Sequence, residues 1–276
     1  MNILKALVLF LLLSSLVSTV FFFFKIDDLP SKEHLLDSIY QQPVQKEVDL
    51  SVEPFELKKE KFIYKITPRY HYEISGLLVA DYSYDNWLDM FRRKDPWYKK
   101  DVCLIWGYNA QSENYKEVNF RYKDRDCFWS TEKEGLIFNN NEISMNHLFP
   151  SNGKIESLIE KAKIGDQVHI KGYLVNYQVI GLDTNFFMNS SSGKDDKGFE
   201  VIYVTDFEIL AEGNTGYKIL YHLSKYISFV LFVIYIIVYF ISLGRKPAIK
   251  KKEVVTELDT DPLREKNFPA AFKDRD

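Results

Sequence analysis

Histidine has the widest chemical range of the residue types in this chain, since its imidazole can act as a base or bind a metal near neutral pH. Three of the five histidines, His71, His147 and His169, lie in the polar central part of the sequence. No two of them have the spacing of a zinc-binding motif such as HExxH. His147, in the segment 146–150 before an expected helix, is the single catalytic candidate, as a base or a metal ligand. The simpler interpretation is that His147 holds a loop by hydrogen bonds.

Other sequence motifs with a known chemistry are absent. There is no GxSxG nucleophile motif and no glycine-rich phosphate loop. Asp183, Asp195 and Asp196 could attract a cation, although the polar segment 190–198 is more simply the tip of a hairpin. Asn189 begins a formal glycosylation sequon, Asn-Ser-Ser. We therefore expect no catalytic set beyond the His147 candidate, no metal site and no cofactor.

The two cysteines, Cys103 and Cys127, lie in segments that are expected to be strands. In an oxidising compartment, two such thiols are bridged more often than free. We expect a disulfide; a pair of inert buried thiols is the alternative, and a chemical role is the third. In the chain-entropy model such a bridge would stabilise the folded domain by about 3 kcal/mol.

An uncharged apolar segment near the N-terminus predicts a membrane-spanning helix. The residues from Ala6 to Phe24 contain no charge, proline or glycine. At about 1.5 Å per residue they are long enough for the hydrocarbon core of about 30 Å. A cleaved signal peptide is the alternative, because Lys5 precedes the segment. The segment is longer than a usual signal core and ends in phenylalanines instead of small residues, which favours an uncleaved anchor.

A second uncharged segment, from Tyr226 to Leu243, can also span a membrane. Five basic side chains follow between Arg245 and Lys252, and short basic flanks stay on the cytoplasmic side. With Lys5 also inside, both termini are cytoplasmic. A buried core helix is the alternative, but it would need to be apolar on all sides.

The charges differ between the two sides of this expected membrane. Between Lys25 and Lys218 there are 25 basic and 32 acidic side chains, a net charge of -7. The outer part is therefore acidic, whereas the inner flank is basic. We expect five parts: a transmembrane helix at 4–25, a stalk with a short helix at 26–61, an outer domain at 62–212, a second transmembrane helix at 219–244, and a cytoplasmic tail at 245–276.

The outer domain has a mainly β pattern with one clear helix. β-Branched and aromatic residues predict strands, and the spacing of Ile155, Leu158, Ile159 and Ala162 predicts a helix that Ser151 begins. The order strand, strand, strand, helix, strand, strand is that of the OB-fold, a five-stranded barrel. Another small α+β barrel or sandwich is the alternative. The expected strands are Tyr70 to Tyr82, Val102 to Gly107, a hairpin of Val118 to Tyr122 with Asp126 to Ser130, Val168 to Tyr177, and Glu200 to Leu210.

Two further segments could form contacts. Tyr173, Val175 and Tyr177 share one face of an expected strand, and Tyr173 and Tyr177 are our binding candidates if that face is exposed. Trp87, Leu88 and Phe91 share one side of a short helix, which we interpret as a packing helix between strands.

Five short segments of the outer domain carry a resemblance to a protein family. They are YEISGL at 72–77, DVCLIWG at 101–107, NHL at 146–148, GDQVHIKGYL at 165–174 and EVIYV at 200–204. With these segments, over about Phe62 to Leu210, the chain resembles uncharacterised bacterial membrane-associated or exported proteins with an OB-like domain. That family has no established activity, so the resemblance implies one domain and no particular chemistry.

The sequence thus predicts a two-pass protein of a bacterial inner or plasma membrane. Its partners would be the lipid bilayer and either another envelope protein or a small polar ligand, bound or scaffolded by an OB-like module outside the cytoplasm. The alternative is an envelope enzyme, a metal-assisted hydrolase using His147 with nearby carboxylates. Nucleic-acid binding by the barrel is a minor alternative, because the acidic domain would repel phosphates.

Overall fold

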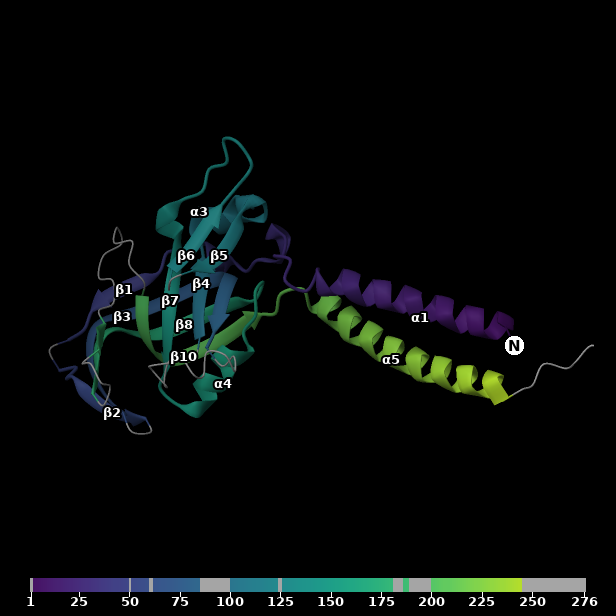
Figure 1. The fold of residues 1–276 in the computed structure, drawn as a ribbon. Coiled ribbons are helices and arrows are strands. Elements are labelled where there is room, and N and C mark those ends of the chain that lie inside the picture. The colour runs from purple at the N-terminus through teal and green to yellow at the C-terminus, as the bar shows by residue number, and fades with distance from the viewer. Residues whose placement is uncertain are drawn as a thin grey trace, which may run out of the picture.

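A computed structural model describes residues 2–49, 51–59, 62–84, 100–123, 126–180, 186–188 and 200–244. Figure 1 shows a β-rich domain from which two long helices, α1 (Asn2–Phe23) and α5 (Thr215–Gly244), extend side by side. Both helices are long and apolar enough to cross a membrane. The chain is therefore a mixed α/β protein with one large sheet and the two expected apolar helices.

The large sheet contains eight of the strands in the described part of the chain. Two of them, β1 and β2, are short strands from the region before the domain. The eight strands are β1 (Val44–Glu47), β2 (Phe55–Lys59), β3 (Phe62–Ser83), β4 (Lys100–Ile105), β7 (Ile143–Pro150), β8 (Gln167–Ile180), β9 (Phe186–Met188) and β10 (Glu200–Ala211).

Five of these strands pair in succession. β3 pairs with β4 and β4 with β7, both antiparallel. β7 is parallel to β10, β10 is antiparallel to β8, and β8 is antiparallel to β3. The succession of pairings therefore returns to the strand at which it began. Helix α4 (Gly153–Lys161) connects β7 to β8.

The third strand of this succession, β7, was not expected from the sequence. We expected the segment 146–150 to be a loop, but it pairs with β4 and β10. From Met145 to Pro150 every residue is buried, so the apolar and polar alternation of a half-exposed strand is missing. Without that alternation, the polar residues Asn146 and His147 indicate a loop when only the sequence is considered.

The expected hairpin lies outside the main sheet. β5 (Asn119–Lys123) and β6 (Asp126–Ser130) form a separate two-stranded sheet. Short helices flank this hairpin: α3 (Gly107–Gln111), η3 (Asn114–Glu117) and η4 (Asn140–Glu142). The expected strands at β3, β4, β8 and β10 are present, with a helix between the third and fourth strands, but β7 replaces the hairpin as the third strand.

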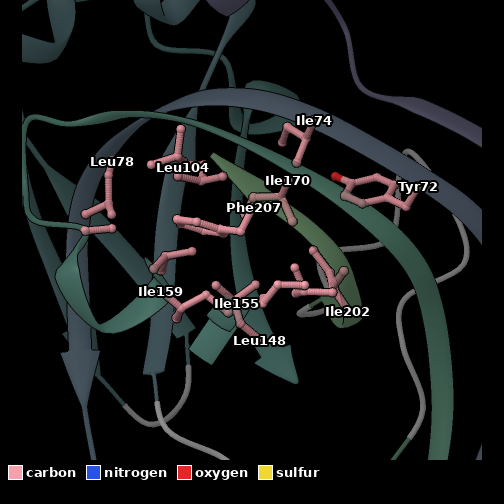
Figure 2. Packing of buried hydrophobic residues seen from close by; sticks show 14 of the residues in the cluster. Tyr72, Ile74, Leu78, Leu104, Leu148, Ile155, Ile159, Ile170, Ile202 and Phe207 are labelled. Carbon is pink, nitrogen blue, oxygen red and sulfur yellow. The ribbon is translucent and has the colours of Figure 1, made fainter. Parts of the chain in front are cut away.

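Helix α4 packs its apolar side into the largest core cluster. Asn152, not Ser151, caps the helix, since its Oδ1 accepts hydrogen bonds from the backbone amides of Lys154 and Ile155. Ile155 and Ile159 contact a cluster that includes Phe207 of β10 (Figure 2). The helix therefore packs into a core to which all five strands of the succession contribute apolar side chains.

The segment 26–61, expected to be a stalk, packs onto the sheet. Its helical part consists of two single turns, η1 (Lys32–His34) and η2 (Asp37–Tyr40). Ile39 is fully buried, in a cluster with Leu77 and Cys103. β1 and β2 both pair with β3. Leu35 and Ile39 of this segment are thus buried against the domain instead of lining a free helix.

Candidate functional site

The catalytic candidate His147 lies in β7 and contacts Asp101 of β4. Its Nδ1 is 2.6 Å from Asp101 Oδ1, and the two side chains are 1% and 0% exposed. Burial lowers the pKa of the His147 imidazole to about 3. The ring is therefore neutral at neutral pH, with Nδ1–H donating to the carboxylate.

Two tyrosines extend this buried pair. Tyr84 donates its hydroxyl proton to Asp101 Oδ2 over 2.8 Å. Its oxygen lies 2.5 Å from the hydroxyl of Tyr122, on the β5–β6 hairpin. Burial, the charge of Asp101 and the bond to Tyr84 raise the pKa of Tyr122. The four groups form a hydrogen-bonded chain that joins β4, β7 and the hairpin, which is the role of a structural network.

The other histidines of the domain lie elsewhere. His169 Nδ1 is 3.0 Å from Ser75 Oγ, and its Nε2 is 3.6 Å from Glu73 Oε1. These three side chains are only partly buried and are cross-strand neighbours on β3 and β8. His71 packs its ring 4.9 Å from that of Tyr173. Among the described residues, no group of three or more His, Cys, Asp or Glu side chains could hold a metal ion.

The two binding candidates differ in exposure. Tyr173 is partly buried against His71. Tyr177 is 4% exposed and packs against Tyr64 and Phe149 in a second core cluster. The pairing of β3 with β8 shifts between Pro68 and Tyr70. Beyond this irregularity, the face of β8 that carries Tyr177 is buried, so the expected exposed face does not exist there.

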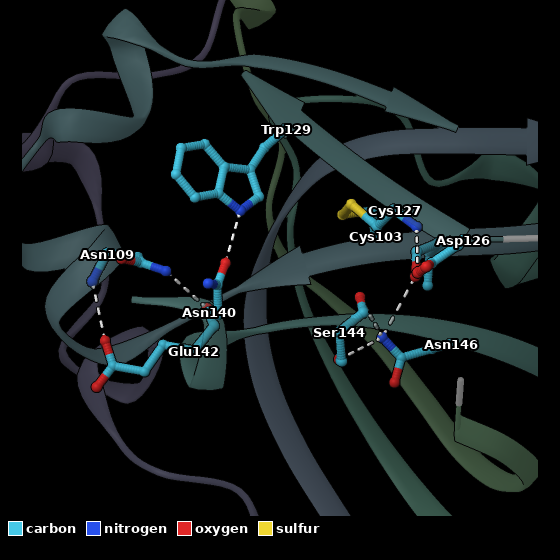
Figure 3. The surroundings of a disulfide bond; sticks show 10 residues. Cys103, Asn109, Asp126, Cys127, Trp129, Asn140, Glu142, Ser144 and Asn146 are labelled. Atoms are coloured by element: carbon cyan, nitrogen blue, oxygen red, sulfur yellow. Dashed lines mark hydrogen bonds between the residues drawn. A yellow bond between two sulfur atoms is a disulfide. The ribbon is translucent and has the colours of Figure 1, made fainter. Parts of the chain in front are cut away.

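The two cysteines form the expected disulfide. Cys103 of β4 and Cys127 of β6 are 5.9 Å apart between Cα atoms, and the bridge links the hairpin to the main sheet (Figure 3). Trp129 of the same hairpin donates from Nε1 to Asn140 Oδ1 over 2.8 Å. The hairpin is thus attached to the domain by a covalent bond and by side-chain contacts.

A buried lysine, which the sequence did not single out, connects the strands to α4. Lys100 Nζ is 2.6 Å from Asp81 Oδ2 and donates to the carbonyl oxygen of Ala162 over 2.5 Å. Burial lowers the pKa of Lys100, and the charge of Asp81 opposes this effect. Both partners stabilise the charged ammonium group in the core.

A polar site lies at the junction between the domain and the apolar helices. Asp166, at the end of the α4–β8 turn, is 2% exposed. Its Oδ1 accepts from the Gly213 amide over 2.8 Å and lies 3.2 Å from Lys218 Nζ on α5. Its Oδ2 accepts from the Lys163 amide over 2.8 Å. One carboxylate therefore connects the domain to the linker and to α5.

Two amide side chains add to this junction. Asn214 donates from Nδ2 to the carbonyl oxygen of Asp28, which follows α1. Gln167 accepts from the Leu36 amide and donates to the His34 carbonyl oxygen, each over 2.7 Å. The contacts of Asp166 with Gly213 and Lys218 span 47 and 52 residues of the chain and had no sequence signal.

Two cavities flank the junction. One, of about 590 Å³, is lined by Pro30, Ala211, Tyr217, Leu220 and neighbouring residues of the linker. The other, of about 550 Å³, is lined by residues that include Asp27 and Lys116. Burial raises the pKa of Asp27, and the charge of Asp81 adds to this effect. Both volumes lie in the range of small-molecule sites.

Several expected features lie outside the described residues. They are the short helix with Trp87, the acidic positions Asp183, Asp195 and Asp196, the Asn189 sequon and the cytoplasmic tail. The chain matches no protein-family model, no curated protein and no solved structure.

Proposed function

We propose that the chain is a two-pass membrane protein in which α1 and α5 cross the bilayer and the β-domain lies outside the cytoplasm. The length and apolar surface of both helices support this proposal. By the positive-inside rule, Lys5 and the basic segment from Arg245 to Lys252 support a cytoplasmic location of both termini.

Contacts between the two helices support α1 as a retained anchor instead of a cleaved signal peptide. Ser228 of α5 donates to Ser15 Oγ over 3.0 Å, and the hydroxyls of Ser228 and Thr19 are 3.3 Å apart. Hydroxyl groups in a bilayer bond either to carbonyl groups of their own helix or to a neighbouring helix, because lipid offers no partner. A processed chain would leave Ser228 facing lipid.

The OB-like barrel is part of the same proposal. The strand order β3, β4, β7, β10, β8 and back to β3, with a helix between the third and fourth strands, supports a Greek-key barrel of this type. Helix α4 would close one end, since Ile155 and Ile159 pack into the cluster that these strands share.

The proposed function is to present this barrel, as a binding or scaffolding module, to another envelope protein or a small polar ligand. The observation that carries it is the junction, where Asp166 binds both the linker amide of Gly213 and Lys218 of α5. Such a connection would hold the module in one orientation to the membrane. A flexible stalk would not.

Topology is tested with reporter fusions at residue 215 and at the C-terminus. We expect a signal from outside at residue 215 and from inside at the C-terminus. A cytoplasmic signal at residue 215 would overturn the proposal.

The partner is tested by in-cell photocrosslinking from Phe128 and Ile137. Both are exposed apolar side chains on or beside the β5–β6 hairpin. A crosslinker at the exposed Lys154 of α4 is the matched control. We expect one protein adduct that forms from the hairpin sites and not from residue 154; equal adducts from all sites would contradict a specific partner surface.

The enzyme alternative rests on the contact of His147 with Asp101. Both side chains are buried, so a substrate would have to reach a core position. Loss of a hydrolase activity in a folded His147→Gln variant would favour the enzyme.

Nucleic acid is a weaker candidate, since the segment from Lys25 to Lys218 has a net charge of -7.

A further inference from the structure

The cavity of about 590 Å³ at the start of α5 has mainly apolar walls. Its lining residues include Pro30, Ala211, and Tyr217 and Leu220 of α5. Gly216 also lines it, and no atom lies within 4 Å of the position that a Cβ would occupy there. The space beside this glycine is therefore open.

Polar groups near the cavity are used by the junction itself. The amide group of Gln167 binds Leu36 and His34, and the carboxylate of Asp166 binds Gly213 and Lys218. The ionisable side chains among the lining residues, His34 and Glu212, are exposed to solvent. An occupant would thus meet mainly apolar walls, because the amide groups of the lining residues Gln167 and Asn214 are already hydrogen-bonded within the junction.

The cavity is continuous with the outer surface of α5. Tyr217 and Leu220 line it and are also 38% and 41% exposed on that helix. If α5 spans the bilayer, these residues lie where the helix leaves it, at the depth of the lipid headgroups. A molecule already in the outer leaflet could then enter the cavity from the side, with its polar end toward water.

We propose that this cavity binds one diacyl phospholipid from the leaflet next to the β-domain, with part of an acyl chain between Pro30 and Leu220. The inference rests on the proposed membrane topology. It makes the lipid a ligand of the junction that joins the module to α5. A small polar ligand fits less well, because these walls offer it few hydrogen bonds.

Native mass spectrometry of the full-length protein, extracted from membranes in mild detergent, tests the proposal. We expect one phospholipid to remain bound per chain. Gly216→Trp should fill the open space and lower the retained phospholipid at least fivefold. Gly153→Trp is the matched control, since a Cβ at Gly153 also meets no atom within 4 Å and this residue begins α4. The control should retain the lipid.

A second measurement keeps the test independent of the variant's folding. The wild-type protein is reconstituted in phosphatidylcholine vesicles that carry a photoreactive phosphatidylcholine. We expect the label to concentrate on the peptides that contain Pro30 and Tyr217. Equal labelling along α1 and α5 would overturn the lipid site, as would unchanged lipid retention in a folded Gly216→Trp variant.

Failure of the lipid site and failure of the topology give different results. Absence of bound phospholipid, with residue 215 reported outside, overturns only the lipid site. A cytoplasmic signal at residue 215 overturns the leaflet assignment together with the topology.

Discussion

The carboxylate of Asp166 lies 3.2 Å from the ammonium group of Lys218, so a turn of the β-domain is bound to the first turns of an apolar helix. The uncharged apolar run from Tyr226 to Leu243 follows Lys218 and Lys225 along α5, whereas Asp166 precedes the strand β8. The same carboxylate binds the Gly213 amide of the linker. One buried acidic side chain of the domain therefore binds both the linker and the helix.

Replacing Asp166 should loosen this junction. In Asp166→Ala, the amides of Gly213 and Lys163 lose their acceptor and Lys218 loses its partner. We expect the free energy of unfolding to fall by about 3 kcal/mol, the range for hydrogen bonds to a buried charge. Denaturant unfolding of the full chain in detergent measures this, with the exposed Glu160→Ala as control. An equal effect in both variants would contradict the role of Asp166.

Removing the disulfide should destabilise the domain and free the hairpin. Without the bridge between Cys103 and Cys127, the unfolded chain gains the entropy of an open loop. We expect the free energy of unfolding to fall by about 3 kcal/mol. Limited proteolysis with and without reductant should show new cleavage in the β5–β6 hairpin of the wild type only under reduction. A Cys103→Ala/Cys127→Ala variant should be insensitive to reductant, and a reductant effect in that variant would point to another cause.

A side chain at Gly172 should disturb the contact of β8 with β10. A Cβ there would clash with the carbonyl oxygen of Tyr203. Because the obstacle is backbone, Gly172→Ala should lower the free energy of unfolding by about 2–3 kcal/mol. The control Gly153→Ala meets no atom within 4 Å and should be near neutral. Thermal unfolding of both variants measures the difference, and a neutral Gly172→Ala would mean that the two strands are farther apart.

Acid should destabilise the domain through His147. The pKa of this imidazole is about 3 in the folded chain and about 6.5 when unfolded, so between these values the unfolded chain binds more protons. The free energy of unfolding therefore decreases as the pH falls from about 6.5 toward 3, by up to about 1.4 kcal/mol per pH unit. His147→Gln should flatten this dependence.

Urea unfolding at several pH values measures the effect of His147. The exposed His34→Gln is the control, and it should keep the slope of the wild type. If His147→Gln also keeps that slope, the buried neutral imidazole is not its source.

Much of the secondary structure follows from patterns within short stretches of sequence. The two apolar helices, the helix α4 and most of β3, β4, β8 and β10 lie where composition and spacing predict them. β7 does not, because both of its faces are buried and its polar residues, Asn146 and His147, resemble those of a loop. β1 and β2, in the segment before the domain, also had no sequence signal, since both strands form by pairing with β3.

The residue types alone established the apolar segments, the charge difference and the candidate side chains, because these properties depend on close neighbours in the chain. The partners of those side chains depend on packing across long separations. Asp101 contacts His147 although the two residues are 46 positions apart in the sequence, and Asp166 contacts Lys218 at a separation of 52 positions. Burial of Tyr177 likewise depends on which face of β8 the neighbouring strands cover. Only the tertiary structure places these groups together, because strand pairing and core packing bring distant segments into contact.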